Sequence, residues 1–374
     1  MSLRYEIRSE HDQYEYRERT TEGLDVWSDR PHLVHHVAGF GVRDDQNPSV
    51  SRFCGSGWQN SLRLCAEGMC AEVLRACYVA EVDSLGRCQP WTSEGLVSWL
   101  GKQQHSWFPS LLARRNLTPH YQPIFCLASG KVSGFESLAR AEHEGRLVNG
   151  AELVHAARCF DEMRTFDQIA RLRAVEVAGG ELTESELLFV NVVPGTIRDT
   201  ERDLATLWAQ AEKAGLSTSQ IVLEFVESEE LPEVDQLRAI SHAVWDRGAR
   251  IALDDFGAGH GSLCLLETLK PDFVKFDRSL LPRWAEPGKK KLLQSLVSYA
   301  QSLGIKTVAE GIETIEHLAL SQDCGFDYGQ GWLLGKPQAE LIRSRILECS
   351  RGYQPPVIRT AVVRRNAHKN PARV

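Results

Sequence analysis

From about residue 107 onward, short apolar runs alternate with amphipathic stretches. Apolar runs of four to eight residues predict buried strands, and a period of three to four residues predicts helices. The predicted strands are His120–Leu127, Val132–Ala139, Leu187–Val193, Ile221–Val226, Arg250–Asp255, Phe273–Phe276, Lys306–Ala309 and Gly329–Leu334. The predicted helices are Glu152–Phe160, Thr165–Ala178, Asp203–Ala214, Gln236–Asp246, Lys290–Leu303 and Ile315–Gln322. This alternation predicts an α/β fold, a (β/α)8 barrel of the TIM type.

The connection between the first two predicted strands changes this picture. It consists of only Ala128-Ser129-Gly130. Parallel neighbours need a crossover of about a dozen residues, so these two strands must form a hairpin. We therefore expect a modified TIM-like barrel with an antiparallel first strand.

The part of the chain before the barrel has a different pattern. It is rich in charged and aromatic residues, its strand periodicity is weak, and helices are suggested only at 59–80 and Trp91–Leu100. We expect residues 1–105 to form a smaller N-terminal sensory or regulatory domain of unknown fold. Residues 106–350 would form the barrel domain, and residues 351–374 a flexible basic tail.

Composition narrows the class of protein. The chain has 374 residues, 43% of them hydrophobic and 25% charged, which is typical of a globular protein with room for two domains. A net charge of −7 argues against a partner that is a nucleic-acid polymer. No apolar run approaches the roughly 18–20 residues of a membrane helix, and no secretory signal is expected, so we predict a cytoplasmic protein without membrane insertion.

Half of the ten cysteines lie close together in the N-terminal part, at Cys54, Cys65, Cys70, Cys77 and Cys88. In a reducing compartment, disulfides between them are not expected. Their spacing fits no Cys-x-x-Cys zinc pattern. Two interpretations stay open: small buried apolar side chains, or a metal or redox sensor that includes the nearby His32, His35 and His36.

Polar side chains stand where most of the predicted barrel strands end. They are Glu136, Asn191, Glu224, Asp254, Asp255, Lys275, Glu310 and Gln330. An ionised carboxylate in apolar surroundings is costly unless it is paired or bound to a metal. One aspartate at a strand end is often a helix cap, but that does not explain a whole set at the same end. Barrel enzymes carry their catalytic groups at this end.

The residue types predict a site for divalent cations. Mg²⁺ and Mn²⁺ prefer carboxylate and amide oxygens. One cation would take ligands from Glu136, Asn191, Glu224 and Asp254, and a second from Asp255, Glu310 and Glu313. Two cations roughly 3.5–4 Å apart can activate a water and stabilise the leaving oxygen of a phosphodiester. Lys275 could orient that water or neutralise developing charge.

At this point an ordered series of motifs over residues 107–345 resembles the EAL family of cyclic di-GMP phosphodiesterases. The motifs are Tyr121-Gln122-Pro123-Ile124, Phe135-Glu136-Ser137-Leu138-Ala139-Arg140, Phe189-Val190-Asn191-Val192, Leu223-Glu224-Phe225-Val226-Glu227, Asp254-Asp255-Phe256-Gly257-Ala258-Gly259, Lys270-Pro271-Asp272-Phe273-Val274-Lys275-Phe276-Asp277, Ala309-Glu310-Gly311-Ile312-Glu313-Thr314 and Gly329-Gln330-Gly331. The resemblance implies metal-dependent hydrolysis of cyclic di-GMP to linear pGpG in bacterial second-messenger signalling.

The resemblance also implies roles for individual residues. The first Mg²⁺ or Mn²⁺ would be bound by Glu136, Asn191, Glu224 and Asp254, and the second by Asp254, Asp255 and Glu310. The catalytic residues would be Lys275, which contacts the nucleophilic water, Glu310, and Gln330, which supports the bound water network. Substrate would contact Gln122, Leu138, Arg140 and Glu313. A homodimer through the barrel is also implied.

Departures from the family pattern are few. Ser137 stands in place of the alanine that gives the family its name, and Phe225 and Val226 replace a β-branched aliphatic residue and a threonine. His260 and Gly261 replace tyrosine and serine in a loop that in the family links the dimer interface to metal binding. These changes bear on rate and regulation more than on activity.

Two other functions stay open from the sequence. The chain could be a cyclic di-GMP receptor with little turnover, which signals through its N-terminal region, or a barrel that acts on another phosphodiester. Loss of ligands would favour the receptor, and every expected ligand is present. The chain has no Gly-Gly-Asp-Glu-Phe cyclase motif.

Overall fold

The computed structural model describes residues 93–226, 233–257, 269–280 and 287–343. It also describes 23–28, 42–43, 50–54 and 77–82, and the single positions 59, 62, 66 and 266. Several predictions fall outside these residues: those on Cys65, Cys70 and Cys88, on His32, His35 and His36, on the loop at His260–Gly261, and on the tail 351–374.

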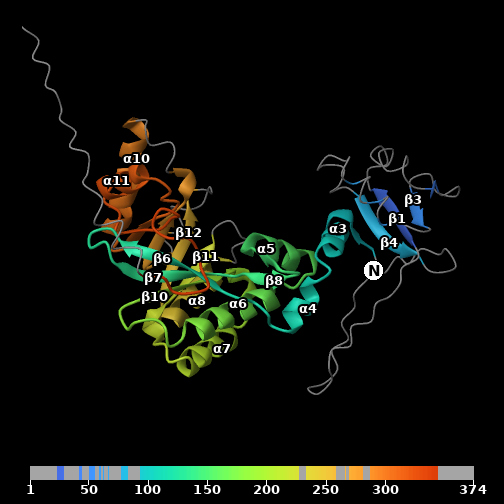
Figure 1. Ribbon diagram of the computed structural model, residues 1–374, viewed down its shortest axis with the longest axis horizontal. Coiled ribbons are helices and arrows are strands. Elements are labelled where there is room, and N and C mark those ends of the chain that lie inside the picture. Colours follow the sequence, from blue (N-terminus) through green and yellow to red (C-terminus); the bar gives the residue numbers. More distant parts are fainter. Residues whose placement is uncertain are drawn as a thin grey trace, which may run out of the picture.

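A closed eight-stranded barrel is the central element (Figure 1). In order around the barrel, its strands are β10 (Leu187–Val192), β11 (Ile221–Val226), β12 (Arg250–Phe256), β13 (Phe273–Phe276), β14 (Lys306–Ala309), β15 (Tyr328–Gly329), β6 (His120–Cys126) and β7 (Val132–Leu138). Strand β6 runs antiparallel to both of its neighbours, and all other neighbouring pairs are parallel. The predicted antiparallel first strand is confirmed.

Amphipathic helices pack their apolar faces against the strands. They are α4 (Phe108–Ala113), α5 (Gly150–Cys159), α6 (Met163–Ala178), α7 (Thr200–Lys213), α8 (Val234–Trp245), α10 (Pro287–Ser302) and α11 (Ile315–Asp323), with the short 3-10 helices η3 (Pro194–Thr196), η4 (Thr218–Gln220) and η5 (Arg278–Leu280). For example, Val175 of α6, Leu207 of α7 and Ile240 of α8 lie in one buried cluster with the strands. Six of these helices lie within a few residues of their predicted positions.

A small hairpin between the second barrel strand and the first large helix was not predicted. It pairs β8 (Ala141–His143) with β9 (Arg146–Val148). The connecting Glu144 and Gly145 both have positive φ, 51° and 73°, as in the tight turns that suit hairpins. Strands of three residues are too short to show a two-residue period. The Glu-Gly pair is therefore the only sequence signal that indicates this hairpin.

The last predicted barrel strand, Gly329–Leu334, is wrong for most of its length. Strand β15 ends at Gly329, and the chain then turns, with the Leu334 and Gly335 amides donating to the Gly331 carbonyl. A side chain at Gly331 would collide with the backbone of Ile312, so the chain passes too close to that segment to extend the sheet. The apolar run Trp332-Leu333-Leu334 resembles a strand in sequence but packs as a turn.

The N-terminal part, for which the sequence predicted no fold, forms a five-stranded antiparallel sheet. Its order is β2 (Val42–Arg43), β3 (Val50–Cys54), β1 (Gly23–Ser28), β4 (Cys77–Val82) and β5 (Glu94–Gly95). The helix predicted over 59–80 is therefore wrong from Cys77 onward. Such short strands contain too few alternations, for example Leu24 and Val26 in β1, to stand out in the sequence.

Helix α3 (Leu96–Gln104) connects the N-terminal sheet with the barrel domain. It begins at Leu96 rather than at the predicted Trp91. Leu96 and Trp99 pack in the core of the sheet, while the Ser98 hydroxyl donates to the Cys159 carbonyl of α5 at 3.2 Å. The domain boundary at residues 105/106 stays a prediction. No helix in the described ranges is both long enough and apolar enough to cross a membrane.

Candidate active site

Two layers of inward-facing side chains follow one another along the barrel strands. The lower layer is apolar: Ile124, Phe189, Val222, Ala252, Phe273 and Val308 form one buried cluster. Because side chains of a strand alternate between its faces, the residue two positions further along faces inward again. These next residues form the upper, polar layer: Asn191, Glu224, Asp254, Lys275 and Glu310, and on the reversed strand β6, two positions earlier, Gln122. Glu136 of β7 and Gln330, which follows β15, complete the layer.

Lys275 stands at the centre of the polar layer and is completely buried. Its ammonium nitrogen lies 3.2 Å from Glu136, 3.0 Å from Glu224, 3.1 Å from Asp254 and 2.8 Å from Glu310. Burial alone would lower its pKa, but the four carboxylates raise the pKa of Lys275 well above its usual value. At neutral pH this group therefore acts as a fixed positive charge and a hydrogen-bond donor, not as a base.

The carboxylates of the polar layer carry more negative charge than one lysine balances. Burial, together with the charges of Glu136 and Asp254, raises the pKa of Glu224 well above its usual range. Burial likewise raises the pKa of Glu310 to about 8. Glu136 differs: despite its burial, the Lys275 charge and hydrogen bonds from Gln330 and Asn191 lower its pKa. The layer is therefore a strong cation site.

The carboxylates fall into two groups that fit divalent cations. Oxygens of Glu136, Glu224 and Asp254 lie within 4.8 Å of one another, and so do oxygens of Asp254, Asp255 and Glu310. Asp254 belongs to both groups. Glu224 Oε2 is buried without a hydrogen-bond partner, and Glu224 Oε1 and Asp254 Oδ1 face only the Lys275 ammonium, at 3.0 and 3.1 Å. Such unsatisfied oxygens are the ligands that hard cations take, so these residues fit a pair of cations.

Asn191 adds an amide to the first group. Strand pairing places it beside Glu224 in the neighbouring strand β11. Its Nδ2 donates to Glu136 Oε1 at 3.1 Å and to the Ser137 carbonyl at 3.4 Å. Because the amide nitrogen is engaged with Glu136, the amide oxygen is the atom that can bind a cation.

Asp255 reaches the site through an irregular backbone. On a regular strand it would face away from the barrel interior, because Asp254 faces inward. The register of β12 shifts between Leu253 and Phe256, and Asp255 has a φ of 56°, a conformation that L-residues rarely adopt. Burial, and then the neighbouring Asp254 and Asp277, raise the pKa of Asp255 to about 6.

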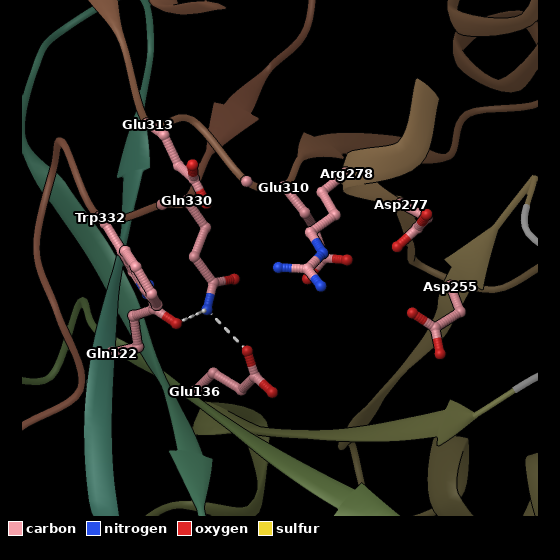
Figure 2. Close-up of a pocket in the computed structure, with 11 residues that line it drawn as sticks. Gln122, Glu136, Asp255, Asp277, Arg278, Glu310, Glu313, Gln330 and Trp332 are labelled. Carbon is pink, nitrogen blue, oxygen red and sulfur yellow. Dashed lines mark hydrogen bonds between the residues drawn. The ribbon is translucent and has the colours of Figure 1, made fainter. Parts of the chain in front are cut away.

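A chain of glutamines orients Glu136. Gln330 Nε2 donates to Glu136 Oε2 at 2.6 Å and to Gln122 Oε1 at 3.1 Å (Figure 2). Gln122 in turn donates from Nε2 to the Gly335 carbonyl at 3.0 Å. Gln330 follows the short strand β15 and Gln122 lies on the adjacent β6, so the antiparallel strand brings the two amides together.

A pocket opens above this layer, and its walls include predicted and unpredicted residues (Figure 2). Predicted residues in its lining are Gln122, Glu136, Asp255, Glu310, Glu313 and Gln330. The others are Asp277, Arg278, Gly311, Gly331 and Trp332. The strand pattern did not predict them because they lie beyond the strand-end residues, in turns or, for Arg278, at the start of η5. Their nearness to Lys275 and Gln330 in the sequence was the available signal.

The four predicted substrate residues, one of which, Glu313, was also a candidate cation ligand, differ in their position relative to the pocket. Glu313 lies on the pocket wall, outside the group that Asp255 and Glu310 form with Asp254. Leu138 and Arg140 follow Glu136 but are not among the residues that line the pocket, and the Arg140 guanidinium donates to the Ala139 carbonyl at 2.8 Å. Their contacts with a substrate stay predictions, as do those of Gln122 and Glu313.

Comparison with known proteins identifies relatives of the barrel. A family profile described as EAL domain matches residues 105–337. The cyclic di-GMP phosphodiesterase NbdA of Pseudomonas aeruginosa is 29% identical over 64% of this chain and 31% of its own length. The probable cyclic di-GMP phosphodiesterase PdeB of Escherichia coli is 27% identical over 64% of this chain and 46% of its own length. The structure of Klebsiella pneumoniae BlrP1 in a manganese/cyclic di-GMP complex is 30% identical, with a TM-score of 0.54, over 60% of this chain and 56% of that chain.

These similarities cover the barrel and leave much of the relatives unmatched. The chain spans less than half the length of the curated relatives NbdA and PdeB. The matched residues 105–337 contain the whole polar layer, from Gln122 to Gln330. The chain belongs to the EAL domain family.

Proposed function

We propose that this chain hydrolyses cyclic di-GMP to linear pGpG with the help of two divalent cations, Mg²⁺ or Mn²⁺. The observation that carries the proposal is the pair of carboxylate groups that share Asp254 around the buried Lys275. It is supported by relatives named cyclic di-GMP phosphodiesterases and by a related structure that contains manganese and cyclic di-GMP.

The reaction joins a water oxygen to phosphorus and breaks the bond from phosphorus to the 3′ oxygen, which takes up a proton. Bound cations would supply Lewis-acid charge to the phosphodiester and to the attacking water. Glu136, Asn191, Glu224 and Asp254 would hold one cation, and Asp254, Asp255 and Glu310 the other.

Three side chains would assist the reaction without binding a cation, one directly and two by positioning Glu136. Lys275 stays protonated, so it would donate a hydrogen bond to the attacking water and counter the charge that develops on phosphorus. Gln330 keeps the Glu136 carboxylate in place, and Gln122 supports Gln330. These groups are rigidly held before substrate arrives, which lowers the reorganisation cost of the reaction.

Incubation of the purified chain with cyclic di-GMP, with and without Mg²⁺ or Mn²⁺, tests the proposal. Chromatography should show pGpG only when the cation is present. Glu136→Ala should abolish the product, whereas Glu142→Ala, which changes an exposed glutamate in the nearby strand β8, should not. Tight binding of cyclic di-GMP without product would instead identify a receptor.

A homodimer through the barrel and a cytoplasmic location stay predictions. Sedimentation analysis of the purified chain, with and without cyclic di-GMP, checks the first of them.

A further inference from the structure

Arg278 is the one cationic side chain among the residues that line the pocket. Five carboxylates share that lining: Glu136, Asp255, Asp277, Glu310 and Glu313. Within the described part of the chain, the Arg278 side chain nevertheless has no hydrogen bond and no ion pair. Figure 2 shows that it extends into the pocket from the wall that carries Glu310.

The stem of Arg278 has a defined position. The residue begins η5 directly after Asp277, whose carboxylate accepts the Ser279 amide at 2.8 Å. On its other side lies Gly311, where an added Cβ would collide with Cβ of Arg278. Gly311 has a φ of 63° and follows Glu310, so Arg278 is packed against the segment that carries a predicted cation ligand.

An exposed arginine is usually only solvated, but several other arginines of this molecule pair with nearby carboxylates. Arg343 binds Glu186 through two bonds of 2.7 Å, and Arg146 binds Glu152 in the same way. Arg164 lies 2.9 Å from Asp203. Arg278 forms an ion pair with none of the five carboxylates that share the pocket lining with it. Its planar guanidinium is therefore available to a ligand that enters the pocket.

The chemistry of the site indicates what that ligand is. If two divalent cations bind, they and Lys275 together balance the five carboxylates of the two ligand groups. The negative charge of a bound phosphate is then left without a partner. A guanidinium fork matches two phosphate oxygens, which makes arginine the preferred phosphate contact.

Topology places Arg278 beside the ligand group of Asp254, Asp255 and Glu310, because β13 lies between β12 and β14. Arg278 follows β13 and Arg140 follows β7, and four strand steps separate these strands in the closed eight-stranded barrel. The two arginines therefore stand on opposite sides of the mouth. Arg278 is on the side of Asp255 and Glu310. We propose that Arg278 is a catalytic residue that binds the reacting phosphate, an inference that rests on the proposed function.

Kinetics of Arg278→Gln test this inference on the full chain. A contact that strengthens as charge builds on the reacting phosphate affects kcat. We expect kcat for cyclic di-GMP to fall about 10²-fold, with a small change in KM. Arg278→Lys, which keeps the charge but loses the fork, should recover part of this loss. Arg238→Gln, an exposed arginine on α8, is the matched control and should be unchanged.

A second measurement separates this role from a structural one. If Arg278 only supported the segment of Gly311 and Glu310, its replacement would weaken cation binding. We expect the Mn²⁺ affinity of Arg278→Gln, measured without nucleotide, to equal that of the unaltered chain. Weakened Mn²⁺ binding, or kinetics within twofold of the unaltered chain, would overturn the inference.

Two further outcomes are informative. A raised KM with unchanged kcat would assign Arg278 to a guanine base or to the other phosphate and contradict our proposal. If the unaltered chain shows no turnover, the proposed function fails on its own. Calorimetric titration with cyclic di-GMP then tests whether Arg278 contacts a phosphate. Such a contact predicts that Arg278→Gln binds cyclic di-GMP roughly tenfold more weakly, and equal binding would overturn the inference.

Discussion

The two inward-facing layers of the barrel use the same strands for opposite purposes. In the lower layer, residues such as Phe189, Val222 and Phe273 exclude water and pack tightly. Two residues further along the same strands, Asn191, Glu224 and Lys275 form a buried charged layer in which some oxygens accept no hydrogen bond. The comparison shows that the period of the strand places the site, while the apolar layer beneath provides the stability that the charged layer lacks.

The largest expected effect concerns the charged layer. Lys275→Met keeps the volume of the side chain but removes the charge that four carboxylates surround. We expect hydrolysis of cyclic di-GMP to fall by roughly 10³-fold or more, measured as initial rates of pGpG formation. Lys306→Met, on the neighbouring strand but exposed and paired with Asp327, should keep near-normal rates. A rate of the Lys275 variant within tenfold of normal would contradict the account.

A substitution in the lower layer tests whether that layer stabilises the fold. Phe189→Ala removes an aromatic ring that is 1% exposed and packs edge-to-face on Phe273 at 5.1 Å between ring centroids. We expect the free energy of unfolding to fall by about 3–5 kcal/mol, measured by urea denaturation. The number of Mn²⁺ ions bound under native conditions should not change. A loss below about 1 kcal/mol would show that the lower layer is not the stabilising one.

The pH dependence of the stability tests the charged layer without any substitution. In the chelator-treated protein, the folded-state pKa of Asp255 is about 6 and that of Glu310 about 8, both above their unfolded values. Between pH 5 and pH 8 the native state therefore binds more protons than the unfolded state, and stability falls as pH rises. We expect the Tm to decrease over this range and Mg²⁺ or Mn²⁺ to restore it most at pH 8. A Tm that rises with pH would reverse the sign that the charged layer requires.

The smallest expected effect comes from the replacement of one carboxylate, that of Asp255. Asp255→Asn keeps the shape of a residue that tolerates positive φ but removes its repulsion by Asp254 and Asp277. At pH 8, without cations, we expect the free energy of unfolding to rise by about 1 kcal/mol once solvent screening is considered. The gain should shrink to roughly half at pH 5 and vanish only below about pH 4, where Asp255 is protonated in the unfolded chain as well. Asp161→Asn is the matched control, since Asp161 also has a φ of 56° but is exposed.

The two-layer arrangement also explains which parts of the fold and of the site could be predicted from the sequence. Apolar runs that end in Glu224, Asp254 or Lys275 mark both the strand and the inward face, so the barrel and its charged layer could be predicted. The short connection before Val132 predicted the antiparallel strand. These features are local in sequence.

Other features depend on contacts that no local pattern reveals. Asp277, Arg278 and Trp332 reach the pocket through turns, and the close approach of Gly331 to Ile312 ends the last strand early. In the N-terminal sheet, β1 pairs with the distant β3 and β4, and its few buried positions give little periodicity. The role of Arg278 could only be inferred once the pocket and its carboxylates were seen together.

Calorimetric titration of Mn²⁺ into the chelator-treated chain at pH 8 tests the central claim most directly. If the charged layer is a paired cation site around Asp254, the unaltered chain should bind two ions. Asp255→Asn should bind one, because it impairs only the group of Asp254, Asp255 and Glu310. Binding of no ion or a single ion by the unaltered chain would contradict the account.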